Sequence, residues 1–71
     1  KRKLTFKEKQ EYEALGRDIE ALEAEKAQLH EALASGQLSV EEITAHSKRL
    51  PLLDEELDEK SMRWLELSEW A

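Results

Sequence analysis

The chain has 71 residues, of which 39% are hydrophobic and 39% charged, and its formal net charge is −6. A chain this short buries a modest share of its surface, which excludes a large core and leaves room for one small domain. Because cysteine is absent, a disulfide, a thiolate zinc site and a cysteine nucleophile are excluded as well.

The positive charge is concentrated at the N-terminal end. Residues 1–9 hold five basic groups against Glu8 alone, a local charge of +4, so that residues 10–71 together carry −10. An acidic body does not wrap nucleic acid along its length, whereas a basic end can touch a phosphate backbone locally. The basic end is therefore the candidate for a nucleic-acid contact.

A first helix is predicted over residues 6–34, after an N-terminal segment of residues 1–4. Thr5 and Glu8 have the spacing of a capping box, which marks a helix start. Apolar residues then recur at alternating steps of three and four, the period of a heptad seam, with Lys26 as a charged position within it. The seam residues are Tyr12, Leu15, Ile19, Leu22, Leu29 and Leu33.

A turn is predicted over residues 35–39. Gly36 suits the left-handed conformation that commonly ends a helix. Ser39 and Glu42 form a second capping box, which marks the start of the next helix.

A second helix is predicted over residues 40–69. Its seam residues are Ile43, His46, Leu50, Leu53, Leu57, Lys60, Trp64 and Leu67. Pro51 lies inside this helix and lacks the amide that would bond to Ser47, so we predict a kink or a break between residues 47 and 52.

The two helices are predicted to form an all-α fold, an antiparallel two-helix coiled-coil hairpin, because a short turn joins helices of similar length. Centring the turn on Gly36 pairs Leu22 with Leu50 and sets Lys26 opposite His46. The two polar interruptions of the seams then share one layer, and such a layer fixes the alignment of a coiled coil.

No catalytic or metal-binding pattern is present. His30 and His46 lack the partners and the spacing of a metal site or a general base. The acidic run over residues 54–59 surrounds the exposed face of a helix and is interpreted as solvated surface. There is no phosphate-binding Gly-rich loop and no nucleophile elbow. We therefore expect no catalytic residue, no metal and no cofactor in this chain.

The hairpin brings the chain ends together, and its register places two cations of the second helix near the basic N-terminal end. The candidate nucleic-acid-binding residues are Lys1, Arg2, Lys3, Lys7, Lys9, Lys60 and Arg63. The alternative is that these charges are simply solvated.

Four aromatic side chains lie near the chain ends: Phe6, Tyr12, Trp64 and Trp70. We predict that they cluster and hold the two termini together, because aromatic burial is the strongest apolar contribution open to a thin hairpin. The alternative is that Trp70 stacks on an exposed base, as aromatic residues of single-strand-binding proteins do.

Three segments carry a family resemblance. Residues 3–8 read KLTFKE, residues 19–25 read IEALEAE and residues 63–67 read RWLEL. These segments resemble the C-terminal domain of Uup-type ABC-F ATPases, which typically opens with K-L-S-[YF]-K-E. Gly16, Lys26 and Pro51 depart from the helix pattern of that family.

The resemblance implies that residues 1–71 are a single C-terminal coiled-coil domain of a soluble, cytoplasmic ATPase. Two upstream ATP-binding cassettes of the same chain would bind ATP and magnesium, and none of their motifs lies in these residues. The resemblance also implies affinity for DNA, and the action of ABC-F relatives on ribosomes makes ribosomal RNA the other candidate partner.

Residues and resemblance together predict an accessory domain that contacts DNA or ribosomal RNA through its basic end. The alternative is a structural coiled-coil arm for protein docking or self-association, with no nucleic-acid contact. The chain starts with Lys rather than Met, so we expect it to be part of a longer polypeptide. The longest apolar run is short, as in Ala32-Leu33-Ala34, so no membrane partner is expected.

Overall fold

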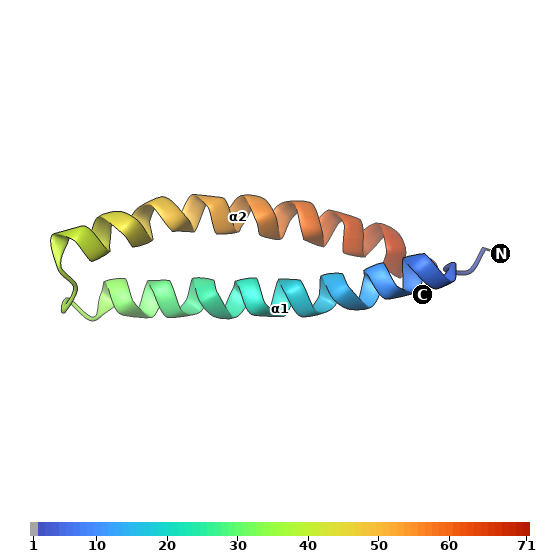
Figure 1. Cartoon of the computed structure of the whole chain (residues 1–71), viewed down its shortest axis with the longest axis horizontal. Helices are drawn as coiled ribbons and strands as arrows, with labels where there is room; N and C mark the ends of the chain where they lie inside the picture. The colour runs from blue at the N-terminus through green and yellow to red at the C-terminus, as the bar shows by residue number, and fades with distance from the viewer. Residues whose placement is uncertain (1) are drawn as a thin grey trace.

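The computed structural model describes residues 2–71 and contains two helices, α1 (Phe6–Ala34) and α2 (Val40–Ser68). Figure 1 shows the helices side by side and antiparallel, with the connection at one end and both chain termini at the other. The molecule measures 54 × 15 × 15 Å. The predicted all-α helical hairpin is confirmed.

Both helices begin with a capping box, as predicted. The Glu8 amide donates to Thr5 Oγ1 at 3.1 Å, and the Thr5 amide donates to Glu8 Oε1 at 3.0 Å. Ser39 and Glu42 repeat this pair of bonds at 3.2 and 3.1 Å. Each box satisfies two amides that have no partner within their helix. Local sequence therefore fixes both helix starts.

The end of α1 is set by Gly36, whose φ of 70° is the left-handed conformation predicted for it. The Ser35 amide still bonds to carbonyl oxygens of the last turn, and the Ser35 hydroxyl donates to Ala32 O at 2.6 Å. A side chain at position 36 would strain this backbone, so glycine ends the helix cleanly.

Pro51 does not break α2, and the predicted break is wrong. The helix is continuous from Val40 to Ser68, with Pro51 inside it and exposed. Figure 1 shows a gradual bow of α2, convex away from α1, in place of a sharp kink. A helix that curves around its core opens slightly on its solvent side, and that is where the proline ring has most room.

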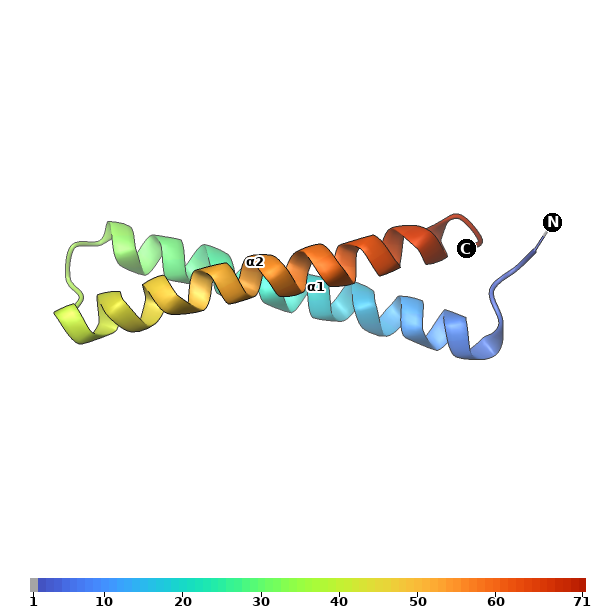
Figure 2. The ribbon, with the colours of Figure 1, turned by 90° about the horizontal axis from the view of Figure 1, so that it is seen from above.

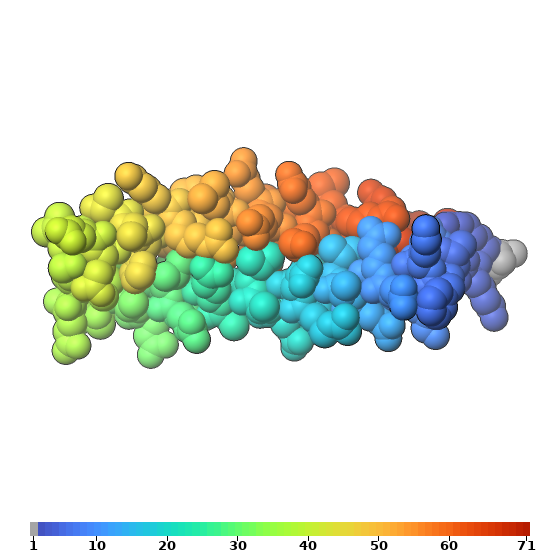
Figure 3. Space-filling model, viewed as in Figure 1, coloured from blue at the N-terminus to red at the C-terminus, as the bar shows by residue number. Residues whose placement is uncertain are grey.

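The core is thin. Only Leu53 and Leu67, 0% and 1% exposed, are fully buried among the described residues, and both belong to α2. The α1 seam residues are half-buried, because one partner helix covers only one side of each. Side chains fill most of the space between the ribbons (Figure 3).

The helices are offset from the predicted register. Tyr12 stacks on Trp64 with ring centroids 5.2 Å apart, whereas a turn centred on Gly36 would set Tyr12 at the level of Lys60. The difference is four residues of α2, about one helical turn. Part of the shift comes from the connection, which is centred on Gln37 because α1 ends at Ala34 and α2 begins at Val40.

The shift also removes the predicted polar layer of Lys26 and His46. Lys26 Nζ instead donates to Asp54 Oδ1 at 2.5 Å, on the flank of the seam. Figure 2 shows that the two helices cross at a shallow angle, so the residues of α1 and α2 that face each other change along the hairpin.

Candidate nucleic-acid interface

Three lysines form the exposed basic part of the N-terminal end. Lys3 precedes α1, while Lys7 and Lys9 lie in its first turns, and all three are exposed. Within residues 2–71 no carboxylate lies in ion-pair distance of these three ammonium groups. The predicted contact residue Lys1 lies outside the described residues. Lys3, Lys7 and Lys9 are therefore available to an anion.

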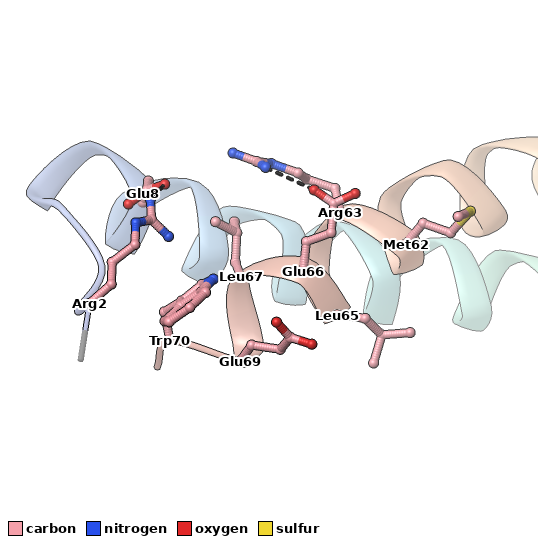
Figure 4. A pocket seen from close by; sticks show the side chains of 9 residues that line it. All are labelled: Arg2, Glu8, Met62, Arg63, Leu65, Glu66, Leu67, Glu69 and Trp70. Carbon is pink, nitrogen blue, oxygen red and sulfur yellow. Dashed lines mark hydrogen bonds and ion pairs between the residues drawn. The ribbon is translucent and has the colours of Figure 1, made fainter.

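Arg2 lies between the two chain ends. Its guanidinium forms an ion pair with Glu8 and lies over the Trp70 ring, 5.3 Å from the ring centroid. Figure 4 shows Arg2 reaching toward Glu8, with the Trp70 ring nearby at the end of the chain. A cation over an indole face is attracted by the ring quadrupole. Arg2 thus ties the N-terminal segment to the C-terminal end.

Lys60 and Arg63 do not join the basic N-terminal end. Lys60 Nζ donates to Asp18 Oδ2 at 3.1 Å. Arg63 makes a bidentate pair with Glu11, at 2.8 and 2.9 Å, and a further bond to Glu66 at 3.1 Å. These two predicted site residues are engaged by carboxylates, because the register leaves them nearer the turn, at Asp18 and Glu11, and short of Lys7 and Lys9.

The predicted aromatic cluster forms in part. Tyr12 and Trp64 stack with their planes 14° apart, and Trp70 contacts Arg2. Phe6, by contrast, is 76% exposed. The stack joins α1 to α2 near the open end of the hairpin, the end that bears both chain termini, so these two rings have a structural role. Phe6 belongs instead to the exposed surface beside Lys7 and Lys9.

Sequence reasoning missed the ion pairs along one side of the seam. Glu11, Asp18 and Glu25 are spaced seven residues apart on α1, and each binds a cation of α2. Arg49 holds Glu25 with two bonds, at 2.8 and 3.1 Å. The signal was the heptad repeat of acidic residues beside the apolar seam.

These contacts shift several carboxyl pKa values in one direction. The hydrogen bond from Arg63 lowers the pKa of Glu11, and the bond from Arg49 lowers the pKa of Glu25. Backbone hydrogen bonds of the two capping boxes lower the pKa values of Glu8 and Glu42. All four carboxylates are therefore held in their charged form by the folded state.

The stability that Glu25 contributes should depend on pH. Its pKa in the folded state lies below the ordinary value of 4.5, so its contribution is present above that pH and is lost as pH falls through the folded-state pKa. We expect Glu25→Gln to lower the melting temperature at pH 7, and the difference from the parent chain to vanish in acid. Circular dichroism melts across this pH range measure it.

Glu55→Gln is the matched control, because Glu55 is exposed and makes no ion pair within residues 2–71. Glu55→Gln should leave the melting temperature at pH 7 unchanged. A Glu25→Gln deficit that persisted undiminished in acid would mean that the side chain acts through packing and not through its charge.

The described residues lack two other kinds of functional feature, a metal-binding cluster and a membrane-spanning helix. Residues 2–71 contain no group of three or more His, Cys, Asp or Glu side chains that could hold a metal. No helix within them is long and apolar enough to cross a membrane. What the arrangement can do chemically is bind an anion at the N-terminal end.

A comparison with protein families supplies the identity. A family model described as the ABC transporter C-terminal domain matches residues 3–69. The chain belongs to this family. It is therefore an accessory C-terminal domain of an ABC protein and not a catalytic ATPase domain. A search of curated proteins and a search of solved structures gave no match.

Proposed function

We propose that this ABC transporter C-terminal domain is the accessory domain of a Uup-type ABC-F ATPase and contacts nucleic acid, DNA or ribosomal RNA. The contact uses Lys3, Lys7 and Lys9, together with Lys1, while Arg2 beside them is paired with Glu8. ATP and magnesium belong to the cassettes of the parent ATPase, and the hairpin serves as an arm that presents the basic end. The KLTFKE opening supports the Uup-type assignment.

The observation that carries this proposal is that unpaired lysines cluster at the N-terminal end, whereas four of the six cations in residues 10–71 are paired with carboxylates and Arg17 and Lys48 are not. Lys26, Arg49, Lys60 and Arg63 are each bound to carboxylates of the facing helix. Lys3, Lys7 and Lys9 lie together at one end with no such partner in residues 2–71. Cations that hold no internal carboxylate are the ones that can replace the counterions of a phosphate backbone.

The salt dependence of binding to duplex DNA tests the proposal. Contact with about three to five phosphates should give a slope of roughly −3 to −4.5 in a plot of log affinity against log salt. The double variant Lys3→Gln/Lys7→Gln should make this slope shallower by about 1.8, because each phosphate that is no longer neutralised accounts for about 0.9. Fluorescence anisotropy of a labelled duplex provides the measurement.

The matched control is Arg17→Gln/Lys48→Gln, which removes the same charge from two exposed cations in the body of the hairpin. It should leave the slope unchanged. Equal effects of the two double variants would show that overall charge governs binding, and absence of binding at low salt would show that the domain is a docking arm instead. A parallel titration of duplex RNA distinguishes the two nucleic acids.

A further inference from the structure

The two flanks of the apolar seam differ in kind. On one, the paired flank, Glu11, Asp18 and Glu25 of α1 hold cations of α2 along most of the hairpin. The other, the open flank, is a groove between the helices, lined by Gly16, Ile19, Glu23, Ser61, Trp64 and Leu65. Ion pairs thus run along most of one side of the seam, whereas the other side holds the Lys26–Asp54 pair, which does not line the groove, and retains apolar surface.

The open flank exposes an apolar side chain that the hairpin itself cannot cover. Leu65 lines the groove and is 58% exposed. Figure 4 shows Leu65 projecting from α2 on the side opposite Arg63, which belongs to the paired flank. Gly16 has no side chain, and only Trp64 Nε1 lies near the place its Cβ would take, at 3.6 Å. The Trp64 indole therefore packs against Gly16, and both residues line the groove.

Charges of opposite sign lie on either side of Gly16 along the same line of α1. Lys9 lies seven residues before Gly16 and Glu23 seven residues after it, each about 10 Å away along the helix axis. Lys9 lines a separate cavity at the end of the hairpin that bears the chain termini, and Glu23 lines the groove itself.

The end of the open flank that bears Glu23 carries more negative charge than Glu23 alone supplies. Asp54 raises the pKa of Lys26 through its hydrogen bond, and the charges of Asp58 and Glu23 raise it further. Three carboxylates therefore surround one ammonium group, which leaves an excess of negative charge. Near the level of Gly16, Arg17 lies one helical turn from Glu13 and one turn from Glu20. The charges around the middle of this face are therefore of both signs.

We propose that the open flank binds a second copy of this chain, with a two-fold axis passing near Gly16. A two-fold axis places residue i of each copy against residue j of the other. Here it sets Lys9 of each copy beside Glu23 of the other, and it brings the two Leu65 side chains and the two grooves into one apolar interface. The product is an antiparallel four-helix bundle.

The self-complementary charge pattern selects a second copy over an unrelated helix. A hairpin with two fully buried residues among residues 2–71 also gains from this arrangement, because oligomerisation is one of the usual ways in which small domains complete a core. The interface is small, so a weak dimer with a dissociation constant of about 10–100 µM is expected.

Sedimentation equilibrium of the 71-residue chain over a range of concentrations tests the proposal. Leu65→Glu places a charge in the groove and should raise the dissociation constant by about tenfold or more. Leu52→Glu is the matched control, since Leu52 is 52% exposed on α2 but does not line the groove. It should leave the dissociation constant unchanged, and circular dichroism confirms that both variants remain helical.

A charge exchange tests the axis itself. Lys9→Glu and Glu23→Lys should each weaken the dimer, because each puts like charges together twice, whereas the double variant should restore it. A chain that stays monomeric at about 1 mM, a dimer indifferent to Leu65→Glu, or a double variant no stronger than the single ones would overturn the proposal. Lys9 also belongs to the proposed nucleic-acid contact, so that contact is tested separately by Lys3→Gln/Lys7→Gln, which leaves Lys9 in place.

Discussion

Replacing Leu53 with Ala is expected to destabilise the hairpin by about 2–5 kcal/mol. Leu53 is 0% exposed and one of two fully buried side chains among residues 2–71. Truncating it removes apolar burial and leaves a cavity between the helices. A domain of this length is stable by about 4–11 kcal/mol, so this single change consumes a large share of its stability. Urea denaturation followed by circular dichroism measures the loss.

The neighbouring Leu52 provides the control, because it carries the same side chain and is 52% exposed. Leu52→Ala should change the free energy of unfolding by less than about 0.5 kcal/mol. Both variants are compared well below the concentration at which copies associate, since dimerisation would add to the apparent stability. Similar losses for the two variants would contradict the assignment of Leu53 to the core.

Replacing Pro51 with Ala is expected to stabilise the hairpin by about 2–3 kcal/mol. Proline inside a helix costs about 3 kcal/mol relative to alanine, because it removes one hydrogen bond and crowds the preceding turn. The α2 helix carries this cost while staying continuous. Since Pro51 is exposed, alanine restores the amide without disturbing the core. Chemical denaturation gives the difference in the free energy of unfolding.

Pro51→Gly separates the two contributions of proline. Glycine also restores the amide, but it is less favourable in a helix than alanine by about 1 kcal/mol, so its gain should be smaller by that amount. Loss of stability in both variants would mean that the bow of α2 needs proline to fit against α1.

The sequence predicted well those features that depend on residues close together in the chain. Thr5 with Glu8 and Ser39 with Glu42 each form a box within four residues, and Gly36 takes the left-handed conformation that ends α1. The bounds of α1 agree with the predicted range, and α2 ends one residue earlier than predicted. The apolar period then determines which faces of the helices meet.

Features that depend on the register were predicted less well. A small change in the path of the connection moves one helix along the other, and nothing local in the sequence reports it. Tyr12 therefore meets Trp64, and Lys26 meets Asp54. The same shift decides the composition of the candidate site, because it carries Lys60 and Arg63 to Asp18 and Glu11. The positions of Lys3, Lys7 and Lys9 do not depend on the register of the two helices, so the sequence alone was enough to predict that they are exposed.

The bidentate pairs Arg49–Glu25 and Arg63–Glu11 close loops of very different length. Their partners are 24 and 52 residues apart, so closing the longer loop costs about 0.7 kcal/mol more in chain entropy. Contacts near the turn therefore form before those at the chain ends during folding. The hairpin closes like a zipper from Gly36 outward, and it peels open from the end that bears Lys3 and Trp70. A pull on the two termini would meet the contact of Arg2 with Trp70 first and the stacked rings of Tyr12 and Trp64 after it.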